Sequence, residues 1–278
     1  MSTQYLLLDG VLYDQALIRL YSRDEDLEIE PLYAGTPWQD VADLGPILIK
    51  PGARSSLMSE FENTVEWQTS AAMITANAPM IEVAQHLRKL NKVKDVIGSE
   101  SLLRYADPLV TWFWLNSYSP AGLRRILGPI NEWRLAAPSP LWLPHEKINW
   151  HVFNSPAAAD SDPIERLAQA QMDGLELAYK WQLKERLYNW LKANQPNDLA
   201  RVTSVHTEDW LNERLSSADA FGLTSERSIA IWCALSLCHG NQFAVTDDGA
   251  YRLWLKDQDA KQLPTADQRL QQYYQESV

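Results

Sequence analysis

The sequence is poor in the residues that build common catalytic and cofactor sites. Only 11 of its 278 residues are glycines, and they do not cluster into the loops that hold nucleotide phosphates. The Gly-x-Ser-x-Gly turn of serine hydrolases is absent, and the five histidines form neither His-x-x-x-His nor His-Glu-x-x-His. We therefore predict no cofactor, no metal and no enzymatic activity. The alternative, an enzyme with an unfamiliar site, would show a closed polar pocket containing carboxylates or histidines with strongly shifted pKa values.

Cysteines and long apolar runs are scarce as well. The only cysteines are Cys233 and Cys238, and a helix would place them about 140° apart, so they cannot easily share a metal, even with His239 nearby. We expect both thiols to be buried, in a reducing compartment. No stretch approaches the ~18 apolar residues of a membrane span, and residues 1–10 lack the basic leader of a secretory signal. These features predict a cytoplasmic protein with no membrane association.

Acidic residues outnumber basic residues along the whole chain. The net charge is −11, and the excess is even: residues 1–134 contain 12 basic and 17 acidic residues, and the remainder contains 13 and 19. Because phosphate binding needs a basic face, nucleic acid is not expected as a partner. The 12 tryptophans are unusually many and suit a binding protein, although we expect most of them in the core.

The first half of the sequence predicts a lobe of strands and helices. Helices are expected to begin near residues 37, 79, 108 and 120, three of them signalled by a capping residue followed by proline. Short apolar runs predict strands at residues 5–8, 46–49, 71–75, 93–97 and 102–105. The acidic run from Asp24 to Glu30 is typical of a solvated loop. Residues 133–153, which are rich in proline and tryptophan, indicate edge strands or extended chain.

A small and polar stretch, residues 155–162, is typical of a linker between lobes. Only helices are expected beyond it, beginning at Asp162, Thr207, Thr224 and Thr265, the first of them running to about Asn194. The predicted fold class is therefore α+β. Residues 1–154 form an α/β-like amino-terminal lobe with a mixed sheet and flanking helices, and residues 155–278 form an all-α carboxy-terminal lobe.

Five short motifs follow one another through the first lobe. They are YLLLDG (5–10), PLYAGTP (31–37), LGPILIK (44–50), HLRKLNKVKDVIGSESLLRYADPLV (86–110) and LGPINEW (127–133). In this order the chain resembles the adaptor chaperones of bacterial type VI secretion, a family long catalogued as a domain of unknown function. The segment LTSERSIAIW (223–232) in the second lobe also fits the family, though less specifically.

The resemblance implies a function in the export of a toxic effector. Proteins of this family are encoded beside an effector, bind its amino-terminal region and promote its loading onto the spike protein VgrG, without being secreted themselves. For this chain, a cognate effector is the implied partner, and the spike is a second candidate. The alternative function is that of an immunity protein, which would bind the toxic domain. The effector fragment that binds the chain distinguishes these two functions.

Two further sequence features suggest residues for partner binding. By resemblance, Arg104, Tyr105 and Asp107 match the most recognisable element of the family. Asp107 followed by Pro108 also predicts a helix start, and Arg104 could pair with a carboxylate to hold a strand to that helix. These residues therefore suit a structural role as well as a partner contact.

The remaining candidates are cationic or aromatic. Arg88, Lys89 and Lys92 form the only basic cluster, which suits the end of a helix or the docking of an acidic segment. The candidate anchors for an apolar effector segment, near the predicted junction of the lobes, are Trp112, Trp114, Trp142 and Trp150.

Overall fold

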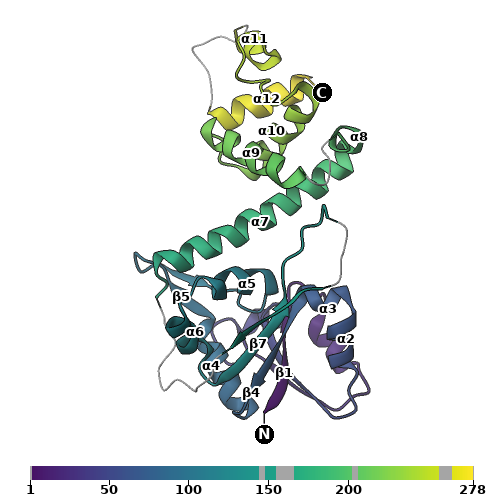
Figure 1. Ribbon diagram of the computed structural model, residues 1–278, viewed down its shortest axis with the longest axis vertical. Coiled ribbons are helices and arrows are strands. Elements are labelled where there is room, and N and C mark those ends of the chain that lie inside the picture. Colours follow the sequence, from purple (N-terminus) through teal and green to yellow (C-terminus); the bar gives the residue numbers. More distant parts are fainter. Residues whose placement is uncertain (1, 144–147, 155–165, 202–205, 257–264, 278) are drawn as a thin grey trace. The chain divides into compact units, whose positions relative to one another are not determined.

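Figure 1 shows the computed structural model of the chain, which describes residues 2–143, 148–154, 166–201, 206–256 and 265–277. The chain divides into two compact units. Unit 1 comprises Met1–Pro138 and Glu146–Tyr179, and unit 2 comprises Ser139–His145 and Lys180–Val278. The predicted lobe boundary and linker, at residues 155–162, lie outside the described residues and stay a prediction. Within the described ranges, no helix has both the length and the apolar content to cross a membrane.

A six-stranded sheet with the order β2-β3-β1-β4-β7-β8 forms the centre of unit 1, and all neighbouring strands are antiparallel. The strands are β1 (Thr3–Asp9), β2 (Leu27–Pro31), β3 (Pro46–Pro51), β4 (Ala71–Ala76), β7 (Ile130–Ala136) and β8 (Trp150–Asn154). Strands β1, β3 and β4 are buried on both faces, so they appear in the sequence as continuous apolar runs. The three strands predicted from those runs are confirmed. Of the edge strands expected within residues 133–153, β8 lies at the edge of the sheet, whereas β7 pairs on both sides, with β4 and β8.

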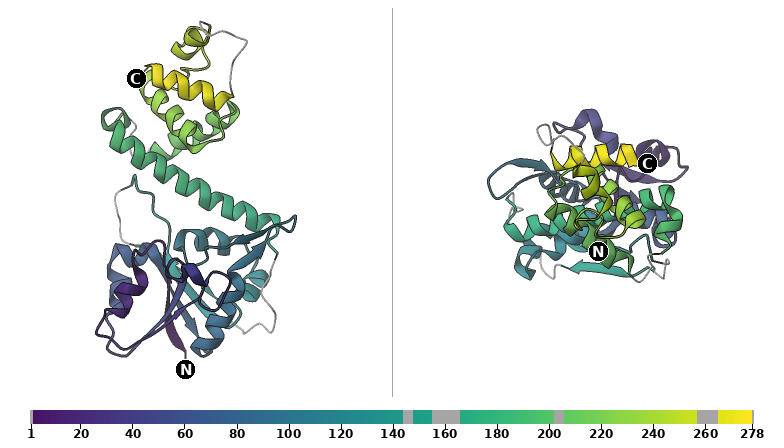
Figure 2. Two further views of the ribbon diagram at one scale, coloured as in Figure 1. Left: turned by 180° about the vertical axis from the view of Figure 1, so that it is seen from behind. Right: turned by 90° about the horizontal axis from the view of Figure 1, so that it is seen from above.

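Helices cover both faces of this sheet (Figures 1 and 2). One face packs against α1 (Ala16–Tyr21), α2 (Leu57–Asn63) and α3 (Val65–Ser70). The other face packs against α4 (Met80–Leu90), α5 (Pro108–Asn116), α6 (Pro120–Leu127) and the start of α7 (Gln169–Asn194). The helices predicted near residues 79, 108 and 120 are confirmed. The N-caps that we expected are formed, because Asp107 accepts a hydrogen bond from the Leu109 amide at 3.0 Å and Ser119 accepts one from Gly122 at 3.3 Å.

Several local predictions in unit 1 were wrong. The helix near residue 37 is a 3-10 helix, η1 (Gln39–Leu44). The strands predicted at 93–97 and 102–105 are the shorter β5 (Lys92–Lys94) and β6 (Glu100–Leu102), which pair with each other in a separate two-stranded sheet. They form a hairpin outside the main sheet because the chain turns at residues 95–99 and then enters the cap of α5.

The acidic run predicted to be a loop contains the edge strand β2. Its side chains alternate: Leu27 and Ile29 pack on the α1–α3 face, while Glu28 forms an ion pair with Lys50 on the neighbouring strand. The two-residue period of this strand was obscured in the sequence, because the half-buried Leu27 and Ile29 are flanked by acidic residues.

In its described residues, unit 2 consists of helices joined by loops and contains no strand. It contains the second part of α7, and then α8 (Pro196–Leu199), α9 (Thr207–Ala220), α10 (Glu226–His239), α11 (Ala250–Lys256) and α12 (Ala266–Ser277). The helices predicted from Thr207, Thr224 and Thr265 are confirmed. Asp162 lies outside the described residues, and α7 begins only at Gln169, because Arg166 still forms an isolated bridge with Lys94. The α+β fold class with an all-helical second part is therefore confirmed.

The two cysteines lie on different sides of α10. Cys233 is buried as predicted, and burial raises the pKa of its thiol to about 12. Cys238 is exposed, so the prediction that both thiols are buried was wrong for this residue. The five-residue spacing rotates it about 140° around the helix axis, away from the side that packs in the core.

The start of α10 depends on a carboxylate from α12. Asp267 accepts hydrogen bonds from the Ser225 amide at 3.1 Å and the Ser225 hydroxyl at 2.9 Å, and from the Thr224 amide at 3.3 Å. These bonds outweigh the effect of burial and hold the pKa of Asp267 below its ordinary value. We expect Asp267→Ala to lower the free energy of unfolding of unit 2 by about 1–2 kcal/mol, as for other lost helix caps. Urea denaturation followed by circular dichroism measures this loss. Asp219→Ala, at an exposed carboxylate on α9, is the matched control, and an equal loss there would contradict the capping role.

Candidate functional site

Residues of the first and fourth motifs meet at the carboxyl end of β1. Arg104 Nη2 lies 3.0 Å from each carboxylate oxygen of Asp9 and 3.6 Å from Asp107 Oδ2. Asp9 Oδ1 also accepts hydrogen bonds from the amides of Val11, at 2.9 Å, and Leu12, at 3.0 Å. Asp9 therefore fixes the turn that follows β1, and Arg104 connects this turn to the start of α5. The strand-to-helix link that we predicted for Arg104 is present in the structure, and its partner is Asp9.

Asp107 is a buried carboxylate that caps α5. Burial raises its pKa above the ordinary value, while the positive charge of Arg104 and the amides of Leu109 and Val110 lower it. Arg104 thus partly offsets the cost of burying a charge at the helix start. The arrangement is that of a structural ion pair, because each of these groups has a partner in the chain.

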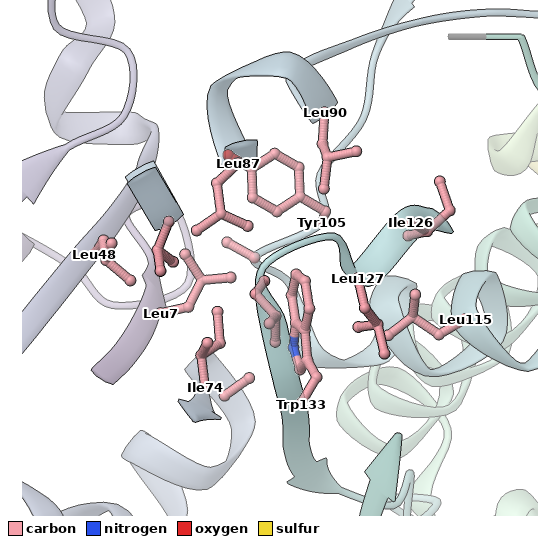
Figure 3. Close-up of a cluster of buried hydrophobic side chains, with 14 of the residues drawn as sticks. Leu7, Leu48, Ile74, Leu87, Leu90, Tyr105, Leu115, Ile126, Leu127 and Trp133 are labelled. Atoms are coloured by element: carbon pink, nitrogen blue, oxygen red, sulfur yellow. The ribbon is translucent and has the colours of Figure 1, made fainter. Parts of the chain in front are cut away.

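Tyr105 belongs to the core of unit 1. It is fully buried, and its hydroxyl donates a hydrogen bond of 2.9 Å to Asn91 Oδ1. The Asn91 amide in turn donates to the Leu32 carbonyl at 3.3 Å. The Tyr105 ring meets Trp133 edge to face, with 6.4 Å between centroids (Figure 3). Tyr105 therefore links the fourth motif to the second and fifth. Because its side chain is fully buried, it cannot contact a partner.

Two glycines allow the turns of the first three motifs to touch. The Gly10 amide donates to the Gly45 carbonyl at 3.1 Å. A Cβ atom at Gly10 would lie 2.3 Å from the Asp43 carbonyl oxygen, and one at Gly45 would lie 2.5 Å from the Tyr33 ring. Both distances are too short for any side chain, which explains why glycine stands at these two motif positions.

The fifth motif meets the fourth at another glycine. His86 Nε2 donates to the Ile126 carbonyl at 2.7 Å, and burial lowers the pKa of this histidine. Gly128 has a φ of +53°, and a Cβ atom at this position would lie 2.3 Å from the His86 ring. His86 is therefore a buried residue that connects α4 to the end of α6.

The basic cluster is largely paired within the chain. Arg88 forms an ion pair with Glu30 and donates to the Pro31 carbonyl at 3.4 Å. Lys92 Nζ lies 2.5 Å from Glu100 on the neighbouring strand. Lys89 lies in the last turn of α4. Arg88 and Lys92 thus attach β2 and β6 to neighbouring elements, which favours the structural interpretation of the cluster; their role in partner binding stays a prediction.

The four candidate tryptophans do not form one surface. Both Trp112 and Trp114 belong to α5. Trp114 is fully buried, and Trp112 is partly buried against His151, with 4.8 Å between ring centroids. Trp150 lies on the opposite face of the sheet, where it packs against Phe61. Trp142 belongs to unit 2, where it is buried among Trp181, Tyr188 and the leucines of α7. Any binding role of these residues stays a prediction.

Other features of the described residues offer little chemistry. No group of three or more His, Cys, Asp or Glu side chains in this part of the chain could hold a metal ion. Two shallow pockets, of about 260 Å³ and 520 Å³, are formed by residues of unit 2. The first is lined mainly by apolar residues around Trp142 and Tyr188, and the second by the loop after α10. Neither includes a residue of the five motifs.

The motif segments coincide with a known family model. Residues 4–125 match the family described as "Domain of unknown function (DUF4123)". This range holds the first four motifs, and the fifth, at 127–133, lies just beyond it. No curated protein and no solved structure matches the chain. DUF4123 is associated with adaptor proteins of type VI secretion, which supports a general adaptor role. At the level of the family, residues 4–125 of unit 1 are therefore similar to the DUF4123 domain.

Proposed function

We propose that this chain is a cytoplasmic adaptor that binds a cognate type VI secretion effector through the effector's amino-terminal region and promotes its loading onto the spike protein. The observation that carries the proposal is the match of residues 4–125 to a family associated with such adaptors. The same residues contain the contacts around Asp9, Arg104 and Tyr105, and they belong to one compact unit on which a partner could dock.

The chemistry of this network is that of a scaffold. An enzyme would use its perturbed groups on a substrate, and it would place them in a pocket. Here three groups of unit 1 whose pKa values are shifted by burial have structural partners instead: Asp107 caps α5, His86 donates to Ile126, and Tyr105 donates to Asn91. None of the three lines either of the two pockets of unit 2 described above, and their partners within the chain support a scaffold role for this part of unit 1.

The proposal can be tested in the bacterium itself. In a strain that lacks this chain, we expect the cognate effector to disappear from the culture medium while other effectors of the same machine are still exported. Restoring the chain should restore export of that effector. Export that continues without the chain would contradict the adaptor function. If the strain poisons itself when the chain is lost and is rescued by deletion of the effector's toxic domain, the chain is an immunity protein.

A further inference from the structure

Two turns of unit 1 touch at the carboxyl end of β1. One follows β1 and contains residues 10–15, and the other is η1, which leads into β3. The Gly10 amide donates to the Gly45 carbonyl at 3.1 Å, and the space for a Gly10 side chain is filled by the Asp43 carbonyl. Asp9 fixes the first turn through the amides of Val11 and Leu12. The two turns therefore present a preformed surface, which we call the β1-end patch.

Large apolar side chains of the β1-end patch are exposed on both turns. Val11 and Leu12 on the first turn are 52% and 44% exposed, and Val41 and Leu44 on η1 are 42% and 50% exposed. A single exposed aliphatic side chain is ordinary on a protein surface, but neighbouring ones often mark an interaction site. Because these side chains stand on turns held by hydrogen bonds, the patch would lose little conformational entropy on binding.

Carboxylates accompany the apolar side chains of this patch. Asp14 lies on the first turn, and Asp40 and Asp43 lie on η1. Among the described residues, no basic side chain lies within ion-pairing distance of these three carboxylates, and Arg104, at the end of β1, is paired with Asp9. A partner that covers the patch would therefore gain from cations placed around its apolar contacts. The same carboxylates would repel a second copy of this chain and an anionic membrane surface.

We propose that the β1-end patch docks a segment of a partner protein that carries apolar side chains flanked by lysine or arginine. This inference deepens the proposed function and rests on it, because it assigns this surface to the amino-terminal region of the effector. The apolar side chains supply the contact area, and the carboxylates select the basic flanks and accelerate association.

The experiment measures binding of the purified full-length chain to the purified amino-terminal segment of the effector encoded beside it. In Leu12→Ser/Leu44→Ser, affinity should fall about tenfold or more, because two apolar contacts are lost. In Asp40→Lys/Asp43→Lys, affinity should also fall, and the remaining binding should lose much of its dependence on salt. The matched control is Val65→Ser/Ile81→Ser, at two aliphatic residues on α3 and α4 that are each 57% exposed, where affinity should not change.

All altered side chains are exposed, so we expect every variant to fold. Thermal unfolding of each variant checks this. Unchanged affinity in both patch variants, with binding by the unaltered chain intact, would overturn this inference and leave the proposed function standing. Failure of the unaltered chain to bind the effector segment would overturn both. Affinity lost in the control as well would also count against the patch, because the effect would then not depend on its position.

Discussion

Replacing Trp133 with alanine is expected to lower the free energy of unfolding of unit 1 by about 3–5 kcal/mol, the usual range for a buried aromatic residue. Trp133 is fully buried on β7, where it packs against Tyr105 and the aliphatic side chains shown in Figure 3. Its indole nitrogen makes no hydrogen bond within the described residues, so the substitution removes packing and leaves no polar partner unsatisfied. The loss should therefore come from the cavity and the lost apolar contacts alone.

Urea denaturation followed by circular dichroism measures the effect of the Trp133 substitution. The matched control is Trp38→Ala, at a half-buried tryptophan whose ring lies 5.7 Å from Tyr33. There we expect a loss of about 1 kcal/mol, because much of its surface is already in water. Similar losses for the two variants would show that the core around Tyr105 and Trp133 is not packed as described.

Replacing Gly10 with alanine is expected to be as damaging, although it adds a single methyl group. The new Cβ atom would lie 2.3 Å from the Asp43 carbonyl oxygen and 2.8 Å from that of Gly45, and both are backbone atoms that cannot rotate away. Relief requires η1 and the start of β3 to move, which would break the hydrogen bond between Gly10 and Gly45. We expect a loss of about 3 kcal/mol or more, at the upper end of the range for overpacking.

The control for Gly10 separates steric conflict from backbone strain. Gly35 has a φ of +72° and open space around it, so Gly35→Ala adds strain without a collision. The expected loss there is about 1 kcal/mol. Thermal unfolding of the two variants makes the comparison, and a Gly10 variant no less stable than the Gly35 variant would contradict the close contact of the two turns.

Much of the fold could be predicted from the sequence because several elements carry strong local signals. The central strands are continuous apolar runs, and Asp107 and Ser119 are each followed by proline at the first helical position. Helices α1 and α3 were missed because each has only 6 residues, too few to establish a helical period. Strand β2 was missed because glutamates alternate with its half-buried apolar side chains.

The candidate site could be predicted only in part. The sequence indicated that Arg104 would pair with a carboxylate, but the chain has 36 acidic residues and the partner, Asp9, is 95 positions away. Only the folded sheet brings these two together. Likewise, nothing in the local sequence distinguishes the buried Trp114 from the partly exposed Trp112, because burial of a tryptophan depends on the elements that pack over it.

The most direct test of the adaptor function is co-purification of this chain with its cognate effector, in full length and with the amino-terminal segment deleted. The account predicts a stable complex with the full-length effector that is lost on deletion and is retained by the isolated amino-terminal segment. A complex that survives the deletion, and that the isolated toxic domain also forms, would contradict the adaptor function and favour immunity.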